Sequence, residues 1–154
     1  GSRSVRKGAN AAKRNTALGS RGSFAIARLD RERSPLIAGI PLMRMKRRIL
    51  GAHYELSVAF LPPRTMRRLN ATYRDRAEST DVLAFPLTPG MGELLFSSAD
   101  TRRRAPLFGM GARAYLGYLF IHGCLHLKGY DHGRTMERLE DSWCRAFRIP
   151  KPAR

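Results

Sequence analysis

The stretch His122-Gly-Cys-Leu-His126-Leu-Lys-Gly129-Tyr-Asp131-His132 decides how this chain is interpreted. It holds three of the four histidines of the protein, spaced as H-x3-H-x5-H. On a helix, His122 and His126 project from one face a single turn apart, which lets two imidazole nitrogens reach one metal ion. Gly129 can end the helix with a positive φ, so that the chain turns back and His132 supplies a third nitrogen. Three neutral histidines with an open fourth position predict a catalytic zinc site rather than a closed structural one.

The three histidines have two other interpretations: core residues without a metal, and the zinc site of a protease. A single histidine on an apolar helix is usually a core residue, but three at this spacing around a glycine are much harder to explain in that way. The same spacing occurs in metzincin proteases, whose pattern is H-E-x-x-H-x-x-G-x-x-H. The glutamate after the first histidine is the general base of a zinc protease, and this chain has Gly123 there. The spacing therefore fits a protease, but the chemistry does not. The fourth histidine, His53, precedes a predicted strand and is interpreted as incidental.

Residues 122–132 resemble the signature of the YbeY family of metal-dependent endoribonucleases and rRNA maturation factors, H-G-x-L-H-L-x-G-Y-D-H, at every fixed position. Residues 69–74 and 80–86, LNATYR and TDVLAFP, resemble the family's L-N-x-x-Y-R and T-D-V-L-S-F-P, with Ala84 replacing Ser. Residues 91–97, MGELLFS, resemble its L-G-D-I-x-I-S strand, with Glu93 in place of Asp. The chain departs from the family in a short connection at Leu87–Met91 and in its strongly basic composition.

The resemblance implies a zinc-dependent, single-strand-specific endoribonuclease that matures the 3′ end of small-subunit rRNA during ribosome biogenesis. One Zn²⁺ per chain would be held by His122, His126 and His132. Arg74 stands where the family has its Tyr-Arg arginine, and we expect it to be a catalytic clamp, since a guanidinium grips two phosphate oxygens at once. We expect Asp131 either to orient a histidine or to act as the base. Expected partners are pre-rRNA, the small ribosomal subunit, an Era-type GTPase and a platform ribosomal protein.

Several points stay open at this stage. Without the resemblance, Arg74 would be interpreted as a surface arginine or as the partner of a nearby aspartate. The attacking group is either water, which leaves a 5′-phosphate, or the 2′-OH of the RNA, which leaves a 2′,3′-cyclic phosphate. A different class of function also fits, namely a ribosome-assembly factor that binds pre-ribosomal RNA with little or no nuclease activity.

The composition is typical of a single folded domain that binds a polyanion. The 154 residues suffice for a single core, and no apolar run approaches the ~20 residues of a membrane span. The net charge is +17, from 29 Lys and Arg against 12 Asp and Glu. Most of the basic residues are arginine, whose planar fork suits phosphate. We expect RNA as the partner, with contacts from Arg64, Arg67, Arg68 and Arg74.

The two cysteines are too few for a disulfide scaffold and suggest a reducing compartment. Cys124 is two residues from both helical histidines, which places it on another face of the helix, and both cysteines are interpreted as core. Residues 1–22 are expected to be a basic flexible or targeting segment, and residues 23–154 the YbeY-like domain. The first segment is rich in Arg, Lys, Ser and Gly and has no acidic residue, which favours a mitochondrial location. A bacterial cytoplasmic protein with a basic arm would look the same.

The order of predicted elements is mixed. Alternating apolar residues predict a strand from Phe24 and another at 56–60, with short strands at 82–87 and 93–97. Helices are predicted at 41–50, 65–73, 112–127 and 135–147. This order predicts a single α+β domain, a small mixed four-stranded sheet packed with helices. The metal site would lie on the long helix and the turn that follows it.

Overall fold

The computed structural model describes residues 22–33, 35–73 and 81–153. Arg74 and residues 1–21 lie outside the described residues, and so does nearly all of the expected basic segment. The elements follow along the chain in the order β1 (Phe24–Arg28), α2 (Leu42–Leu50), β2 (Glu55–Phe60), α3 (Pro63–Tyr73), β3 (Val82–Thr88), β4 (Met91–Phe96), α4 (Ser98–Arg104), η1 (Ala105–Phe108), α5 (Ala112–Leu127) and α6 (Arg134–Phe147). Every helix and strand predicted from the sequence is present, with ends that differ by at most two residues.

The four strands form one mixed sheet in the order β1-β2-β4-β3. β1, β2 and β4 run parallel, and β3 is antiparallel to β4. The short connection noted at Leu87–Met91 becomes a tight hairpin, in which the amide of Gly90 donates to Thr88 Oγ1 at 3.3 Å. Pro86 lies in β3 beside a register irregularity, and an edge strand tolerates a residue that has no N–H to donate. The predicted α+β fold with a small mixed sheet is confirmed.

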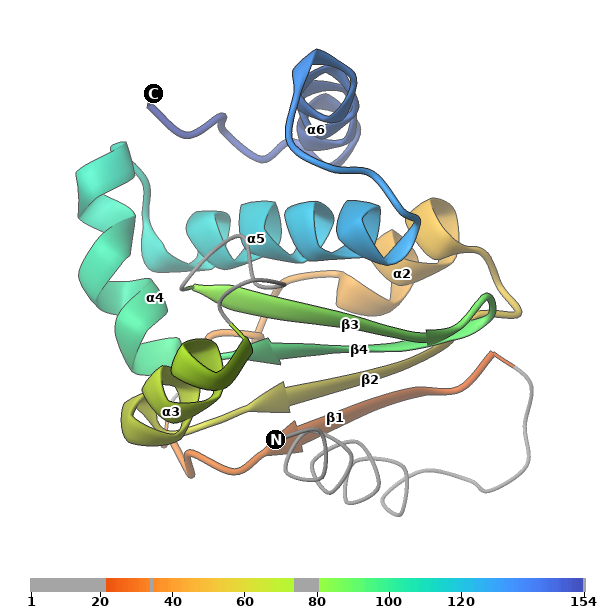
Figure 1. Cartoon of the computed structure of the whole chain (residues 1–154). Helices are drawn as coiled ribbons and strands as arrows, with labels where there is room; N and C mark the ends of the chain where they lie inside the picture. The colour runs from red at the N-terminus through yellow and green to blue at the C-terminus, as the bar shows by residue number, and fades with distance from the viewer. Residues whose placement is uncertain (1–21, 34, 74–80, 154) are drawn as a thin grey trace.

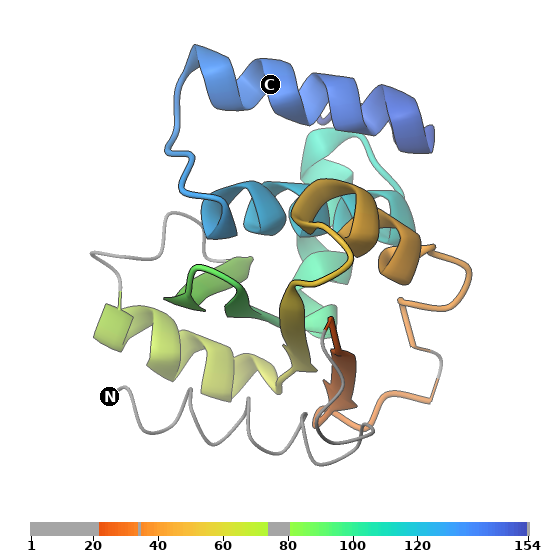
Figure 2. The same ribbon diagram turned by 90° about the vertical axis from the view of Figure 1, so that its right-hand side faces the viewer.

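The helices form layers on both faces of the sheet. α5 and α2 cover one face, α6 lies outside α5, and α3 covers the opposite face (Figures 1 and 2). Successive side chains of β2 point to opposite faces of the sheet, as they do in any strand. Leu56, Val58 and Phe60 belong to the core beneath α5, whereas Ala59 packs with α3 residues such as Met66.

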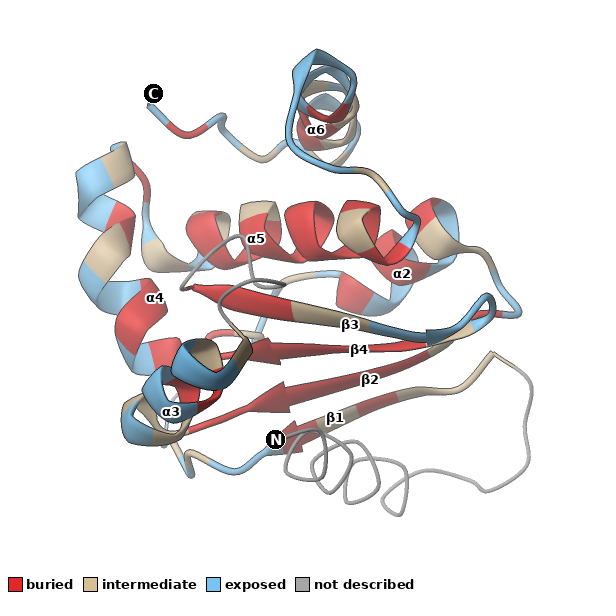
Figure 3. Ribbon diagram, viewed as in Figure 1, coloured by how far each residue is buried: buried red, intermediate tan, exposed pale blue. Residues whose placement is uncertain are grey.

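α5 is buried around most of its circumference because it lies between the sheet and α6 (Figure 3). Both cysteines are free and buried, Cys124 on α5 and Cys144 on α6, which confirms their interpretation as core residues. Burial raises the pKa of the Cys124 thiol. Among the helices of the described ranges, none combines the length and the apolar character needed to cross a bilayer.

α4 has no counterpart among the elements predicted from the sequence. Its N-terminus is capped by Ser97, whose side chain accepts a hydrogen bond from the Asp100 amide at 3.1 Å. The buried residues of α4 are polar, Ser98, Asp100 and Thr101. A short helix that buries polar side chains shows neither an apolar stripe at helical spacing nor a long apolar run, the signals that predicted α6 and α5.

Candidate functional site

The three histidines of the motif come together at the C-terminal end of α5. His122 and His126 lie on the helix, Gly129 has a φ of 97°, and His132 follows in the turn before α6. One ring nitrogen of each histidine can be chosen so that all three lie within 4.8 Å of one another. The predicted three-histidine cluster is therefore present.

Hydrogen bonds fix which nitrogen of each helical histidine faces the cluster. Nδ1 of His126 lies 2.9 Å from the carbonyl oxygen of Tyr130, to which it can only donate. Nδ1 of His122 lies 2.5 Å from Oε2 of Glu140, a carboxylate that accepts. With both protons on Nδ1, both Nε2 atoms carry lone pairs, and they lie 3.1 Å apart. Two facing lone pairs suit a shared cation, and zinc–nitrogen bonds of about 2.0–2.1 Å place tetrahedral ligands about 3.3 Å apart.

Burial decreases across the cluster in a way that leaves one side open. His122 is 6% exposed, His126 is intermediate and His132 is exposed. Three imidazoles with a solvent-facing side match the arrangement in which a metal keeps a position for water or substrate. These residues thus fit a metal ion as a catalytic-type set of ligands.

Gly123 shows why the protease alternative fails on structural grounds. A Cβ atom at this position would lie 2.7 Å from Leu94 Cδ2 and 3.3 Å from Val82 Cγ2. α5 therefore approaches the sheet closely at this point, and a side chain such as glutamate would fit only if the buried Leu94 side chain moved. The glycine that removes the protease base is the same residue that lets α5 pack on β4 and β3.

Glu140 is a site residue that the sequence analysis missed. It is 3% exposed and reaches His122 from α6, a helix that was predicted from the sequence without any part in the site. One signal was available, because Glu140 lies four residues from both Met136 and Cys144, which are buried on the same face. A carboxylate in the apolar stripe of a helix needs a buried partner.

The remaining predicted site residues are not gathered at the histidines. Asp131 is exposed in the turn just before His132, and its role as an orienting group or base stays a prediction. Arg64, Arg67 and Arg68 are exposed on α3, on the opposite side of the sheet from α5 (Figure 2). Arg74, the expected phosphate clamp, lies outside the described residues.

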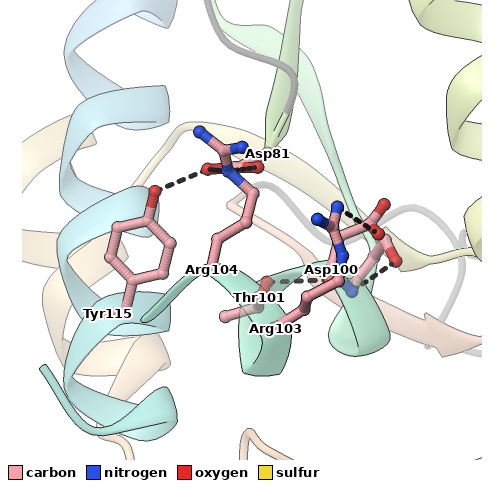
Figure 4. Close-up of polar contacts among 7 residues, drawn as sticks. Asp81, Asp100, Thr101, Arg103, Arg104 and Tyr115 are labelled. Atoms are coloured by element: carbon pink, nitrogen blue, oxygen red, sulfur yellow. Dashed lines mark hydrogen bonds and ion pairs between the residues drawn. The ribbon is translucent and has the colours of Figure 1, made fainter. Parts of the chain in front are cut away.

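A second polar cluster lies near the other end of α5 (Figure 4). Asp81 is 2% exposed, and Arg104 Nε lies 2.8 and 2.9 Å from its two carboxylate oxygens. The Tyr115 hydroxyl donates to the same carboxylate at 2.5 Å. The hydrogen bond to Asp81 raises the pKa of Arg104, and burial, followed by the bond to Asp81, raises the pKa of Tyr115. The cluster joins the start of β3 to α4 and α5.

A groove opens between α3 and α4 beside this second cluster. Its volume is about 480 Å³, and its walls are formed by Met66, Arg67, Asn70, Ala71, Asp81, Asp100 and Arg103. Arg103 is held across α4 by Asp100 at 3.2 Å. The groove is therefore lined by apolar and polar side chains, with one arginine on each helix.

The fold and the site together describe an α+β domain in which three histidines, on and just after a long buried helix, form a cluster compatible with a metal ion. The family model described as "Endoribonuclease YbeY" matches residues 36–144. The chain belongs to the YbeY family.

Curated relatives described as "Endoribonuclease YbeY" agree with this assignment. The protein from Gluconobacter oxydans is 37% identical over 105 residues, which cover 64% of this chain and 62% of the relative. The Wolinella succinogenes protein is 43% identical over 82 residues, 51% of this chain and 59% of the relative. The Lacticaseibacillus casei protein is 33% identical over 117 residues, 68% of this chain and 77% of the relative. The chain thus spans only 59% to 62% of the length of the first two.

A solved structure agrees with the fold. The solution structure of TM1509 from Thermotoga maritima has a TM-score of 0.55 and 24% sequence identity, and the match covers 79% of this chain and 86% of that one. The three relatives named above are bacterial. The mitochondrial location expected from the N-terminal composition has no support among them.

Proposed function

We propose that this chain is a zinc-dependent, single-strand-specific endoribonuclease that acts on rRNA precursors. The observation that carries the proposal is the pair of Nε2 atoms of His122 and His126, turned toward one another by the hydrogen bonds of their Nδ1 atoms within a three-histidine cluster. The family match and the relatives named as endoribonucleases support the class of reaction. Maturation of the 3′ end of small-subunit rRNA, with the small subunit, an Era-type GTPase and a platform ribosomal protein as partners, is part of the same proposal.

Zinc bound to His122, His126 and His132 would lower the pKa of water to about 7 and polarise a phosphoryl oxygen. The chain itself supplies the geometry. Glu140 and the Tyr130 carbonyl hold two imidazoles in one tautomer, so that no ring proton blocks the centre. The exposed position of His132 leaves an approach for a single strand. In this proposal, Arg74 clamps the phosphate and Asp131 orients a histidine or takes a proton.

We further propose that the α3 arginines bind RNA away from the bond that is cleaved. Arg64, Arg67 and Arg68 lie across the sheet from the histidines, and Arg67 shares the α3–α4 groove with Arg103. Guanidinium groups on both walls can hold consecutive phosphates, and the groove is large enough for part of a nucleotide.

The extent of the domain and its location are also proposals. We place the start of the YbeY-like domain at residue 23, because β1 begins at Phe24 and takes part in the sheet. Residues 1–22 would then form a separate basic segment. The bacterial relatives favour the bacterial cytoplasm over the mitochondrion as the place of action.

The test is cleavage of single-stranded rRNA fragments by the zinc-loaded chain and by its His126→Ala variant. Loss of a metal ligand should lower cleavage at least on the order of 10²-fold, as removal of one transition-state-stabilising group does, while RNA binding measured by filter retention stays within a factor of about two. A folded His126→Ala variant that cleaves as the parent does would exclude the metal from the reaction.

The binding-only alternative is favoured by the exposed arginines of α3, which serve assembly without catalysis. It predicts that His126→Ala still binds ribosomal particles and still supports small-subunit maturation. Failure of maturation by a folded variant that retains particle binding would decide in favour of the nuclease.

A further inference from the structure

The contact between α5 and α6 includes a short chain of polar groups behind the histidine cluster. Tyr118 Oη donates to Glu140 Oε1 at 3.3 Å, and Glu140 Oε2 accepts from His122 Nδ1 at 2.5 Å. The Tyr118 ring also lies against the His122 ring, with centroids 6.0 Å apart. One carboxylate therefore contacts a tyrosine through one oxygen and a histidine through the other.

This arrangement has a direct consequence for the ligand atom of His122. A carboxylate can accept but not donate, so it holds the proton of the imidazole on Nδ1 and leaves Nε2 as the lone-pair atom. The same contact fixes the angle of the ring, because both partners are buried, with side chains 8% and 4% exposed. A negative charge next to Nδ1 also makes Nε2 a stronger donor to a cation.

The location of Glu140 adds a second consequence. His122 and His126 belong to α5, whereas Glu140 belongs to α6, which lies outside α5 and away from the sheet (Figure 1). Glu140 is buried on α6 together with Met136 and Cys144, while Leu139, Trp143 and Phe147 pack against the core in a partly buried state. A cation held by His122 would strengthen the bond between His122 and Glu140, and would thus strengthen the packing of α6 on α5.

We propose that Glu140, supported by Tyr118, is a positioning residue that sets the metal affinity of the histidine cluster and couples metal binding to the docking of α6. The proposal rests on the metal site of the proposed function. It assigns to α6 a part in metal binding, although α6 supplies none of the three ligands. Glu140 acts through His122 and does not touch substrate.

The first experiment measures the dissociation constant of Zn²⁺ by competition with a chromogenic chelator, at one pH, for the parent and for Glu140→Gln and Glu140→Ala. Removal of a carboxylate that orients a ligand typically weakens metal affinity by roughly 10- to 100-fold. We expect the lower figure for Glu140→Gln, which keeps an acceptor oxygen but loses the charge, and the higher one for Glu140→Ala. Tyr118→Phe should weaken affinity less than either.

The matched control is Asp141→Asn, which makes the same change of charge one residue further along α6. Asp141 is paired with Lys151 at 3.1 Å and is half-buried, and a step of one residue turns it away from His122. Its zinc affinity should equal that of the parent. Equal losses in Asp141→Asn and Glu140→Gln would overturn the proposal, because the effect would then follow the charge of the helix rather than the contact.

The second experiment follows amide hydrogen exchange of α6 with zinc and after chelation. We expect zinc to slow exchange in α6 of the parent and to do so much less in Glu140→Gln. Thermal unfolding of the metal-free proteins, followed by circular dichroism, distinguishes a positioning role from a merely structural one. A merely structural role would lower the melting temperature without changing zinc affinity. If Glu140→Ala does not fold, Glu140→Gln, which has the same size, decides the matter.

The outcomes also separate this inference from the proposed function. A parent chain that takes up no Zn²⁺ overturns the metal site itself. A parent that binds Zn²⁺ tightly, with folded Glu140 variants that bind it equally tightly, overturns the role of Glu140 alone.

Discussion

A buried carboxylate from another part of the chain lies near each end of α5, and the two carboxylates have different partners. Near the first turn, Asp81 is bonded by Arg104 at 2.8 Å and by the hydroxyl of Tyr115. Near the last turns, Glu140 is bonded by Tyr118 and by His122, whose other nitrogen faces a second imidazole at 3.1 Å. The first carboxylate contacts an arginine, and the second contacts a histidine of a cluster that could hold a metal ion.

Because of this difference, the two clusters are expected to respond differently to substitution. Folding alone brings Arg104 to Asp81, so that cluster is complete in the folded chain and can serve to fix α4 and β3 against α5. The histidine cluster is arranged around a point that a cation from solution would occupy. Breaking the first cluster should therefore affect stability, and breaking the second should affect metal binding.

The largest expected effect comes from His122→Ala. Zinc binding free energies of about 10–16 kcal/mol in structural sites are shared among four ligands, so loss of one should cost at least about 3 kcal/mol of metal affinity, a factor of roughly 10². Elemental analysis of the purified parent should find about one zinc per chain and little in the variant. A zinc content that is the same in both folded proteins would contradict the assignment of the ligands.

Arg104→Ala should have the next largest effect, and on stability instead. Removing one partner of a buried ion pair costs about 3–5 kcal/mol, and the partial exposure of Arg104, 32%, reduces our expectation to about 2–3 kcal/mol. Urea unfolding at neutral pH would measure the loss. Zinc affinity of the folded variant should be unchanged.

Arg103→Ala is the matched control on the same helix. Its side chain is 67% exposed in its pair with Asp100, and exposed ion pairs contribute about 0–1 kcal/mol. If the two variants lost equal stability, the Asp81 cluster would have no special structural role.

Tyr115→Phe should cost less, about 1–2 kcal/mol, for a lost hydrogen bond to a charged group. It should also change the pH dependence of stability. The pKa of Tyr115 is raised in the folded protein by burial and by Asp81, so the folded state holds its proton more tightly than the unfolded state does. This contribution is complete below about pH 10, the usual tyrosine pKa, and is lost as pH rises above it. Urea unfolding between pH 9 and 11 should show a smaller alkaline decrease in the variant than in the parent.

The contrast between the two clusters also explains what the sequence could predict. The histidine cluster is local, since eleven residues contain all three ligands and the glycine turn, and helical spacing suffices to bring them together. Likewise, a long apolar run predicted α5, and an apolar stripe at helical spacing predicted α6, each within a residue of its ends. Long-range polar partners could not be predicted in this way. Glu140 meets His122 only after α6 docks, and Asp81 and Arg104 are 23 positions apart on elements whose packing no local pattern encodes.

The smallest expected effect concerns RNA binding by Arg67, which lines the α3–α4 groove. Replacing one arginine that contacts a phosphate should reduce the slope of log affinity against log salt by about one and cost on the order of 1 kcal/mol at low salt. The measurement is a salt titration of binding to a single-stranded rRNA fragment. Arg47→Ala is the control, since Arg47 is also exposed but lies on α2, on the other side of the sheet. A groove that contacts RNA predicts a change in slope for Arg67→Ala alone, whereas equal changes would mean that the basic charge acts as a diffuse field and that the groove has no particular part in it.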